Sequence, residues 1–224
     1  MSNINVLKRD GTQEQLNLEK VHKMVEFACE GLAGVSESQV EIQSQLQFCD
    51  GIKSSDIQEI LIRSASDLIS EEHPNYQYVA ARLLLFGLRK AVHGHPEILP
   101  PLLEHIKGCV DKGVYDGTIV NRYSEEEWDR INSFVEHERD YLFTYAGLRQ
   151  VVDKYLVQDR STGQHYESPQ QMYIMIAATL FANYPTETRL DYVRRYYNAI
   201  STHKINIPTP IMGGVRTPIR QFAS

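Results

Sequence analysis

Apolar residues recur three or four positions apart along most of the chain, which is the spacing of amphipathic helices. Before residue 94 this spacing predicts four helices, beginning near residues 18, 37, 54 and 76. Ser36 is the predicted N-cap of the second helix, because its hydroxyl can accept a free backbone N–H. Ser55 with Gln58 forms a capping-box pattern at the start of the third helix.

A β-hairpin is predicted ahead of these helices. Asn5–Lys8 and Gln13–Leu16 are candidate strands, and Asp10-Gly11 between them is a turn signal because glycine adopts positive φ at low cost. The hairpin and the four helices together predict a first domain over residues 1–94. The stretch 93–101, rich in His, Gly and Pro, predicts a boundary after it.

Signals typical of helix starts also occur within residues 95–203. Ser124 with Glu127 forms a capping box, and Ser168-Pro169 with Gln171 combines an N-cap, a proline in the first turn and a glutamine three positions on. A small hairpin is predicted around Arg160–Gly163. Further helices are expected over 101–113, within 134–156 and over 186–200. These patterns predict a helical domain over residues 95–203.

The tail, residues 204–224, has a different character. Lys204–Ile207 predicts a strand, and three prolines and the pair Gly213-Gly214 argue against any helix after it. Thr209, held between two prolines, is either part of an irregular linker or the rim of a binding pocket. The fold class expected for the whole chain is mainly α (α+β), with short β segments.

Composition narrows the possible functions. Of the 224 residues 42% are hydrophobic and 23% charged, which is typical of globular proteins, and the net charge of −6 argues against a nucleic-acid partner. The N-terminus lacks the apolar run of a signal peptide, and no stretch approaches the roughly 18–20 apolar residues of a membrane span. Three scattered cysteines without a CxxC pair suit a reducing compartment. We therefore expect a cytoplasmic protein with no membrane or nucleic-acid partner.

Lysines near the hairpin are a candidate anion site. Lys8 and Arg9 lie at the predicted turn, Lys20 in the first turn of the following helix, and Lys90 near the end of the fourth helix. Ammonium groups and a helix N-terminus both favour phosphate. The alternative is a set of solvated surface lysines around an ordinary hairpin.

Two other groups of reactive side chains favour a structural interpretation. The run His137–Asp140 contains acid and base groups, but consecutive helical residues point about 100° apart, so ion pairs are expected there rather than catalysis. Cys29, Cys49 and Cys109 are interpreted as buried, inert thiols, because they lack the positive surroundings that activate a nucleophile.

Several motifs resemble the large (α) subunit of class Ia ribonucleotide reductase, of the bacterial and T4-like phage type. Val6–Gly11, Leu16–Lys20 and Asp50–Ile57 are similar to its ATP-cone, a β-hairpin plus four-helix unit. The tail Pro208–Ser224 resembles the segment that enters the reductase α/β barrel with its first strand. The resemblance covers essentially the whole chain, and the family's first redox-active cysteine comes immediately after the position of Ser224.

The resemblance implies two sets of site residues. An allosteric ATP site, which in this family often also takes dATP, would contact Lys8, Glu14, Gln15, Leu16, Asn17, Leu18, Glu19, Lys20, Ser54 and Lys90. Thr209 and Ser224 would contact the ribonucleoside diphosphate substrate. Several relatives have histidine where this chain has Gln58 and Gly87, so the resemblance implies ATP binding with a weak response to dATP.

The implied activity is the reduction of ribonucleoside diphosphates to deoxyribonucleoside diphosphates for DNA synthesis. In the family the catalytic residues lie beyond residue 224, so neither a catalytic residue nor a metal is expected in this chain, nor reductase activity from the chain alone. The implied partners are the rest of the α subunit with the barrel, a β subunit with a di-iron tyrosyl radical, and thioredoxin or glutaredoxin. An apolar docking surface is expected around residues 204–224.

Two other functions are consistent with a cone. A stand-alone ATP-cone would sense nucleotide or bind a partner without any enzyme activity. A transcriptional repressor of this kind pairs the cone with a zinc ribbon, which requires CxxC pairs that this sequence lacks.

Overall fold

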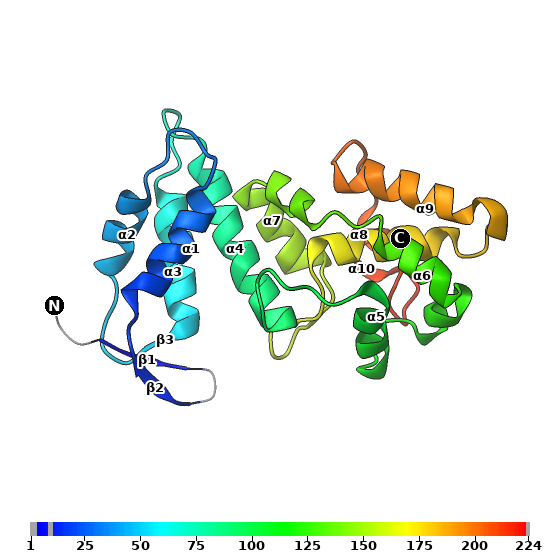
Figure 1. Cartoon of the computed structure of the whole chain (residues 1–224), viewed down its shortest axis with the longest axis horizontal. Coiled ribbons are helices and arrows are strands. Elements are labelled where there is room, and N and C mark those ends of the chain that lie inside the picture. Colours follow the sequence, from blue (N-terminus) through cyan, green and yellow to red (C-terminus); the bar gives the residue numbers. More distant parts are fainter. Residues whose placement is uncertain (1–3, 9–10, 223–224) are drawn as a thin grey trace. The chain divides into compact units, whose positions relative to one another are not determined.

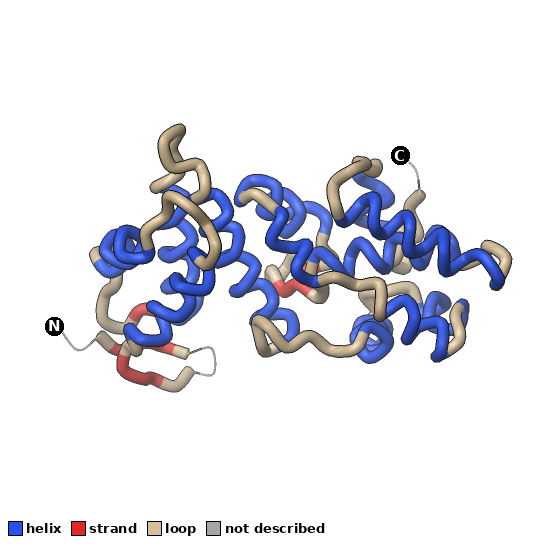
Figure 2. Tube along the Cα trace, turned by 45° about the horizontal axis from the view of Figure 1, so that its top comes forward, coloured by secondary structure: helices blue, strands red, loops and turns tan. Residues whose placement is uncertain are grey.

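Helices dominate the computed structural model, which describes residues 4–8 and 11–222 (Figure 2). Contacts divide the chain into two units: residues up to 87 with 143–149, and residues 88–142 with 150 onward. Helix α4 (Tyr76–His93) begins in the first unit and ends in the second. None of the helices within the described ranges is long and apolar enough to cross a membrane.

The first unit contains a three-stranded sheet of order β2-β1-β3 (Figure 1). The predicted hairpin is confirmed as β1 (Asn5–Leu7) antiparallel to β2 (Gln13–Gln15). A third strand, β3 (Ile52–Lys53), pairs parallel to β1 and has no signal in the sequence pattern. Asp50 secures this arrangement, since its carboxylate accepts the Asn5 backbone N–H at 2.8 Å.

The four predicted helices follow, with α1 over Leu18–Cys29, α2 over Glu37–Gln45 and α3 over Ser54–Asp67 ahead of α4. The Ser36 cap is confirmed, because its hydroxyl accepts the Gln39 N–H. The Tyr76 hydroxyl accepts the Ser36 N–H and donates to Gln39, which ties α2 to α4. Buried apolar residues from three of these helices form the core: Val21, Val25, Ala28, Leu61, Ala65, Val79, Leu83.

The predicted capping box of the third helix is wrong. α3 begins at Ser54, so that its N-cap is Lys53, two residues before Ser55, and no side chain caps it. The Gln58 side chain turns away from the helix start and donates to the Leu83 carbonyl of α4 at 2.7 Å. A tertiary hydrogen bond thus replaces the local one.

The second unit is helical around two long helices, α8 (Pro169–Phe181) and α9 (Thr186–Ser201), which pack on each other. The capping box at Ser124 is confirmed, and in α8 the Gln171 side chain accepts the Ser168 N–H at 2.9 Å. Shorter helical elements of this unit include α5 (Leu102–Asp111), η1 (Gly117–Arg122), α6 (Glu125–Asn132), η2 (His137–Leu142) and η3 (Val151–Tyr155). The predicted small hairpin is present as β4 (Gln158–Asp159) and β5 (Gln164–His165).

The helical stretch predicted within 134–156 is broken into separate turns. Helix α7 (Tyr145–Gln150) lies between η2 and η3, and all but its last residue belongs to the first unit. η3 is a π-helix, in which the Leu156 N–H donates to the Val151 carbonyl five residues back, at 3.0 Å.

The tail prediction is wrong in two respects. Lys204–Ile207 forms no strand, and a helix, α10 (Thr209–Gly214), follows it. Pro208 at the N-cap and Pro210 in the first turn are compatible with a helix, because the N–H groups that they lack have no helical partner at those positions. Within the described residues, the first regular element of the tail is therefore a helix and not a strand.

A buried ion pair attaches this tail to the second unit. The fully buried Arg216 pairs with the fully buried Glu167, to which its Nε donates at 2.8 Å. Its two terminal nitrogens donate to the Met212 carbonyl at 2.6 Å and to the Tyr155 carbonyl at 3.1 Å. Glu167 also accepts the Tyr115 hydroxyl and, at 2.7 Å, the Val157 N–H. Each charge is thus surrounded by partners.

Removal of one charge should strongly destabilise this unit. We expect Arg216→Met to lower the free energy of unfolding by about 3–5 kcal/mol, because the Glu167 carboxylate would remain buried without its cation. Urea unfolding followed by circular dichroism measures the loss. The exposed pair of Arg194 with Asp191 is the matched control, since Arg194→Met should cost about 1 kcal/mol or less. Equal losses in the two variants would contradict the assigned role.

Candidate functional site

A cluster of three charged side chains lies on the hairpin and the start of α1. The Lys8 ammonium is 2.5 Å from Glu14 Oε1, and the Lys20 ammonium is 3.6 Å from the same oxygen. The hydrogen bond from Lys8, together with the charges of both lysines, lowers the pKa of the Glu14 carboxyl. We call Lys8, Glu14 and Lys20 the hairpin cluster.

Strand register and a helix cap bring further predicted residues to the hairpin cluster. Leu7 pairs with Lys53, so the next residues along the two parallel strands, Lys8 and Ser54, leave the sheet at the same end. Asn17 caps α1 by accepting the Lys20 N–H at 3.1 Å. The fold therefore collects a hydroxyl and a helix start around the two lysines.

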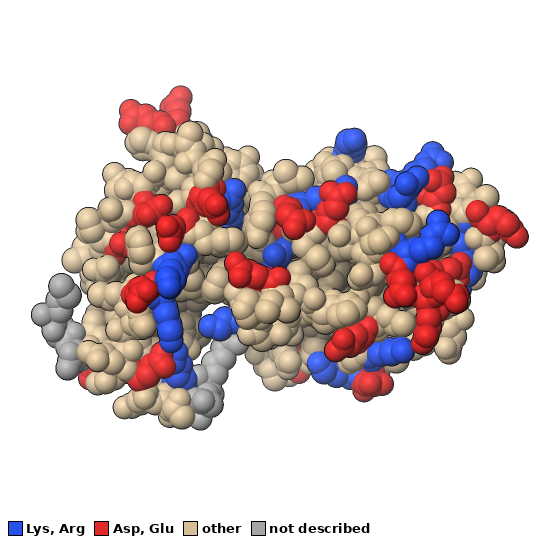
Figure 3. Space-filling view, in the orientation of Figure 1, with Lys and Arg blue, Asp and Glu red and all other residues tan. Residues whose placement is uncertain are grey.

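The remaining predicted nucleotide contacts differ in their positions. Gln15, Leu18 and Glu19 are exposed, and Leu16 is half-buried. Lys90 is also exposed, but it lies in the last turn of α4, in the part of that helix that belongs to the second unit. In the space-filling view, Lys or Arg side chains lie next to Asp or Glu side chains over the hairpin and α1 (Figure 3).

The positions of Gln58 and Gly87 touch each other within the first unit. A Cβ atom added at Gly87 would lie only 3.0 Å from Gln58 Cγ. The Gln58 amide is already engaged with the Leu83 carbonyl, at 2.7 Å. Neither residue therefore offers an imidazole at this place.

Thr209, the other predicted contact, is exposed at the start of α10. Its hydroxyl lies 3.5 Å from the Tyr155 hydroxyl. Ser224 lies outside the described residues, as does Arg9 of the hairpin turn.

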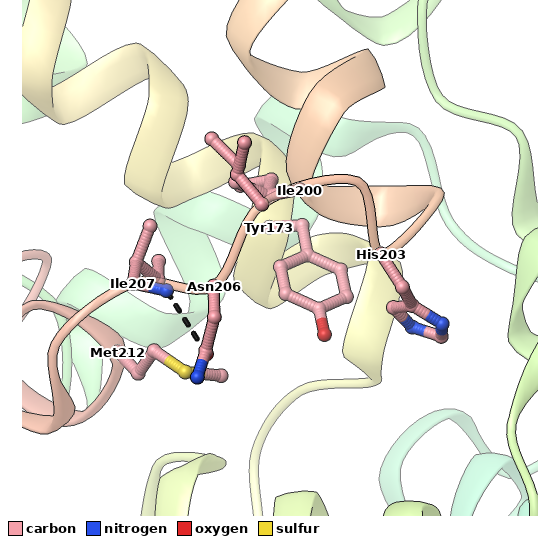
Figure 4. A pocket seen from close by; sticks show the side chains of 7 residues that line it. Tyr173, Ile200, His203, Asn206, Ile207 and Met212 are labelled. Atoms are coloured by element: carbon pink, nitrogen blue, oxygen red, sulfur yellow. Dashed lines mark hydrogen bonds between the residues drawn. The ribbon is translucent and has the colours of Figure 1, made fainter.

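A cavity of about 160 Å³ lies beside α10. Figure 4 shows the Tyr173 ring between His203 on one side and Asn206 and Met212 on the other. Three isoleucines complete the lining: Ile200, Ile205, Ile207. Apolar side chains and the polar groups of Tyr173, His203 and Asn206 thus line the cavity together.

Two charged side chains of the run His137–Asp140, those of Arg139 and Asp140, form ion pairs with residues outside the run. The buried Asp140 pairs with Arg89 at 2.7 Å and accepts the Gln170 amide at 2.9 Å. Arg139 pairs with Glu136 at 2.6 Å, not with its neighbour Glu138. These contacts bear out ion pairing for Arg139 and show it for Asp140, with partners that the sequence did not reveal.

The cysteines are only partly as predicted. Cys29 and Cys109 are buried, and burial raises the pKa of their thiols to about 11 and about 12, so both are poor nucleophiles. Cys49 is exposed, which corrects the expectation that it is buried.

Three histidines of the second unit are held neutral by their surroundings. Burial lowers the pKa of His93, His105 and His137 to about 4 in each case. The Nε2 atom of His105 lies 3.6 Å from the Cys109 sulfur. The centres of the His93 and His105 rings are 5.6 Å apart. Among the described residues, His, Cys, Asp and Glu side chains form no group of three that could hold a metal ion.

Two domain families match this chain. The ATP cone domain matches residues 4–91, which contain the whole hairpin cluster, and the all-alpha domain of ribonucleotide reductase matches residues 141–220. The chain belongs to the ribonucleotide reductase α-subunit family. Residues 4–91 are hereafter called the cone.

Named relatives agree with both matches. The chain is 54% identical over 219 residues to the ribonucleoside-diphosphate reductase subunit alpha of Haemophilus influenzae, covering 98% of this chain and 29% of the relative. It is 54% identical over 222 residues to the reductase 1 subunit alpha of Escherichia coli, covering 99% and 29%. The enzyme of phage T4 is 44% identical over 225 residues, covering 100% and 29%. The chain thus spans about 29% of the length of these relatives.

The neutral histidines make the stability of the second unit sensitive to acid. In the unfolded chain a histidine takes up its proton near pH 6.5, whereas these three resist protonation until about pH 4. The contribution of these histidines to the free energy of unfolding is therefore fully present above pH 6.5 and is lost as the pH drops from 6.5 to 4. The change from 6.5 to about 4 in His105 alone corresponds to about 3.5 kcal/mol of unfolding free energy, at about 1.4 kcal/mol per pKa unit. Urea unfolding at four pH values between 7 and 4.5 measures this slope.

The variant His105→Gln should reduce that slope. His22→Gln is the matched control, because His22 is exposed and its hydrogen bond to Glu41 raises its pKa instead of lowering it. An unchanged slope in His105→Gln would refute the assignment of acid sensitivity to the buried ring.

Proposed function

We propose that this chain is the N-terminal, regulatory part of a ribonucleotide reductase α subunit, and that its cone binds ATP as an allosteric effector. The observation that carries the proposal is the hairpin cluster: two lysines share one carboxylate at an exposed helix start, inside the match to an ATP cone. Phosphate oxygens can replace that carboxylate, because an exposed ion pair contributes little stability.

The nucleotide would use the polar groups that the fold collects there. Lys8 and Lys20 suit the phosphates as point charges. Exposed polar groups along 14–19 suit the ribose and adenine, and Ser54 adds a hydroxyl at the start of α3. The full proposed set is Lys8, Glu14, Gln15, Leu16, Asn17, Leu18, Glu19, Lys20, Ser54 and Lys90. Residues 1–94 would form this allosteric domain and 95–203 the helical domain.

The tail would contribute one wall of the substrate site. Thr209 and Ser224 are proposed to contact a ribonucleoside diphosphate that is reduced to its deoxy form. The rest of the α subunit would supply the catalytic cysteines, a β subunit the di-iron tyrosyl radical, and thioredoxin or glutaredoxin the electrons. Apolar side chains of the tail that are largely exposed support docking of the remaining barrel: Ile205 (45%), Ile219 (78%) and Phe222 (52%).

Calorimetry of the chain with ATP tests the cone. We expect ATP to bind, and Lys8→Met to weaken binding about tenfold or more, because a charge-assisted hydrogen bond to a phosphate is lost. Lys23→Met is the matched control, since Lys23 lies one turn along α1, pairs with Glu19 at 3.2 Å and is outside the proposed set. A chain that binds no ATP, or a Lys8→Met variant with unchanged affinity, would refute the site.

The activity of the assembled enzyme in the presence of dATP tests the regulation. We expect dATP to have little inhibitory effect on the assembled enzyme at concentrations at which ATP occupies the cone, because the Gln58 amide is engaged with Leu83 and Gly87 has no side chain. Reductase activity is measured with each nucleotide in turn. Strong inhibition by dATP, coupled to tight binding, would contradict this expectation.

A further inference from the structure

A π-helical turn places the Tyr155 side chain beside Thr209, the residue proposed to contact the substrate. Tyr155 is the last residue of the π-helix η3, whose wide turn closes through the bond from the Leu156 N–H to the Val151 carbonyl. π-helical turns are rare and occur frequently at functional sites, since the additional residue changes the direction in which side chains leave the helix. Here the side chain at the end of the turn reaches Thr209.

The two hydroxyls are close without being locked together. Tyr155 Oη and Thr209 Oγ1 are 3.5 Å apart, longer than the about 2.7–2.8 Å of a strong O–H···O hydrogen bond. Thr209 is exposed and Tyr155 is half-buried. Both hydroxyls can therefore turn toward a ligand that arrives from the solvent side.

The backbones that carry these hydroxyls are held by one buried group. The Arg216 guanidinium donates to the Tyr155 carbonyl at 3.1 Å and to the Met212 carbonyl of α10 at 2.6 Å. Met212 lies one turn after Thr209 in the same helix. Since Arg216 is fully buried and paired with Glu167, the spacing between η3 and α10 is fixed before any ligand binds.

Lys154 adds a positive charge at the same place. Its ammonium lies 5.2 Å from the centre of the Tyr155 ring, and Lys154 is exposed. In the described part of the chain, no carboxylate lies within ion-pair distance of this ammonium. The hydrogen bond with Thr209 and the charge of Lys154 lower the pKa of the Tyr155 hydroxyl, which agrees with the cation facing that group.

We propose that Lys154 binds the diphosphate of the substrate and that Tyr155 positions the Thr209 hydroxyl for the same group. A cation without a carboxylate partner next to two available hydroxyls suits the oxygen atoms of a diphosphate. The inference rests on the proposed function, because it takes Thr209 as part of the substrate site.

Steady-state kinetics of the complete α subunit that contains this chain, assembled with its β subunit, tests the proposal. Lys154→Met should raise the KM for the nucleoside diphosphate about tenfold with little change in kcat, since the lost contact is to a phosphate that does not react. The rise should be equal for substrates with different bases, because the diphosphate is common to all. Lys154→Arg should retain most of the affinity.

Lys112→Met is the matched control. Lys112 lies in the same unit and its ammonium is 5.7 Å from the centre of the Tyr166 ring, so that variant loses a similar cation–aromatic contact away from Thr209. Its KM should not change. If Lys154→Met lowers the unfolding temperature, Lys154→Gln provides the same kinetic comparison with a polar side chain.

A double-mutant cycle tests the positioning role. Tyr155→Phe and Thr209→Val should each raise the KM, and the double variant should raise it by less than the product of the two factors. An unchanged KM in Lys154→Met and Lys154→Gln, a rise that depends on the base, or fully independent effects in the cycle would overturn the proposal. An assembled wild-type enzyme without reductase activity would refute the proposed function instead.

Discussion

The ion pair between Arg216 and Glu167 is the contact on which the organisation of the second unit most depends. Both side chains are fully buried. Burying two charges is costly unless they pair with each other and their remaining polar atoms also find hydrogen-bond partners. The surroundings meet that requirement with two main-chain carbonyls for the guanidinium, and with the Tyr115 hydroxyl and the Val157 N–H for the carboxylate. This one pair thus connects four segments that are far apart in the sequence: the loop after α5, η3, the small hairpin and α10.

Local signals in the sequence were sufficient for most helices. The capping residues Ser36 and Ser124 and the start of α8 at Pro169 were predicted correctly, because each depends on hydrogen bonds within four residues of chain. Predictions failed where distant contacts decide. Gln58 bonds to Leu83 rather than to its own helix start, and the tail forms α10 with Met212 and Arg216 held against the rest of the unit. No local pattern contains that information.

In the candidate site, too, local sequence signals predict some features and distant contacts decide the others. Lys8 and Lys20 could be selected from the sequence, because a hairpin turn and a helix start lie next to them. The parallel pairing of β3 with β1, which brings Ser54 to the same end of the sheet, could not, since a two-residue strand has no periodicity to detect. The π-turn that directs Tyr155 toward Thr209 was equally hidden, because residues 151–155 have the apolar spacing of an ordinary helix.

Two carboxylate–cation pairs of this chain differ in their exposure to solvent, and this difference suits them to different roles. Glu14 between Lys8 and Lys20 and Glu167 against Arg216 are both carboxylates paired with cations. The buried pair cannot exchange its partner, because removal of either charge leaves the other in a medium that does not solvate it. The exposed hairpin cluster can, because water and salt already compensate most of its Coulomb energy, so a phosphate at the proposed site would displace Glu14 at small cost. The surface pair is therefore suited to a reversible effector and the interior pair to a permanent connection.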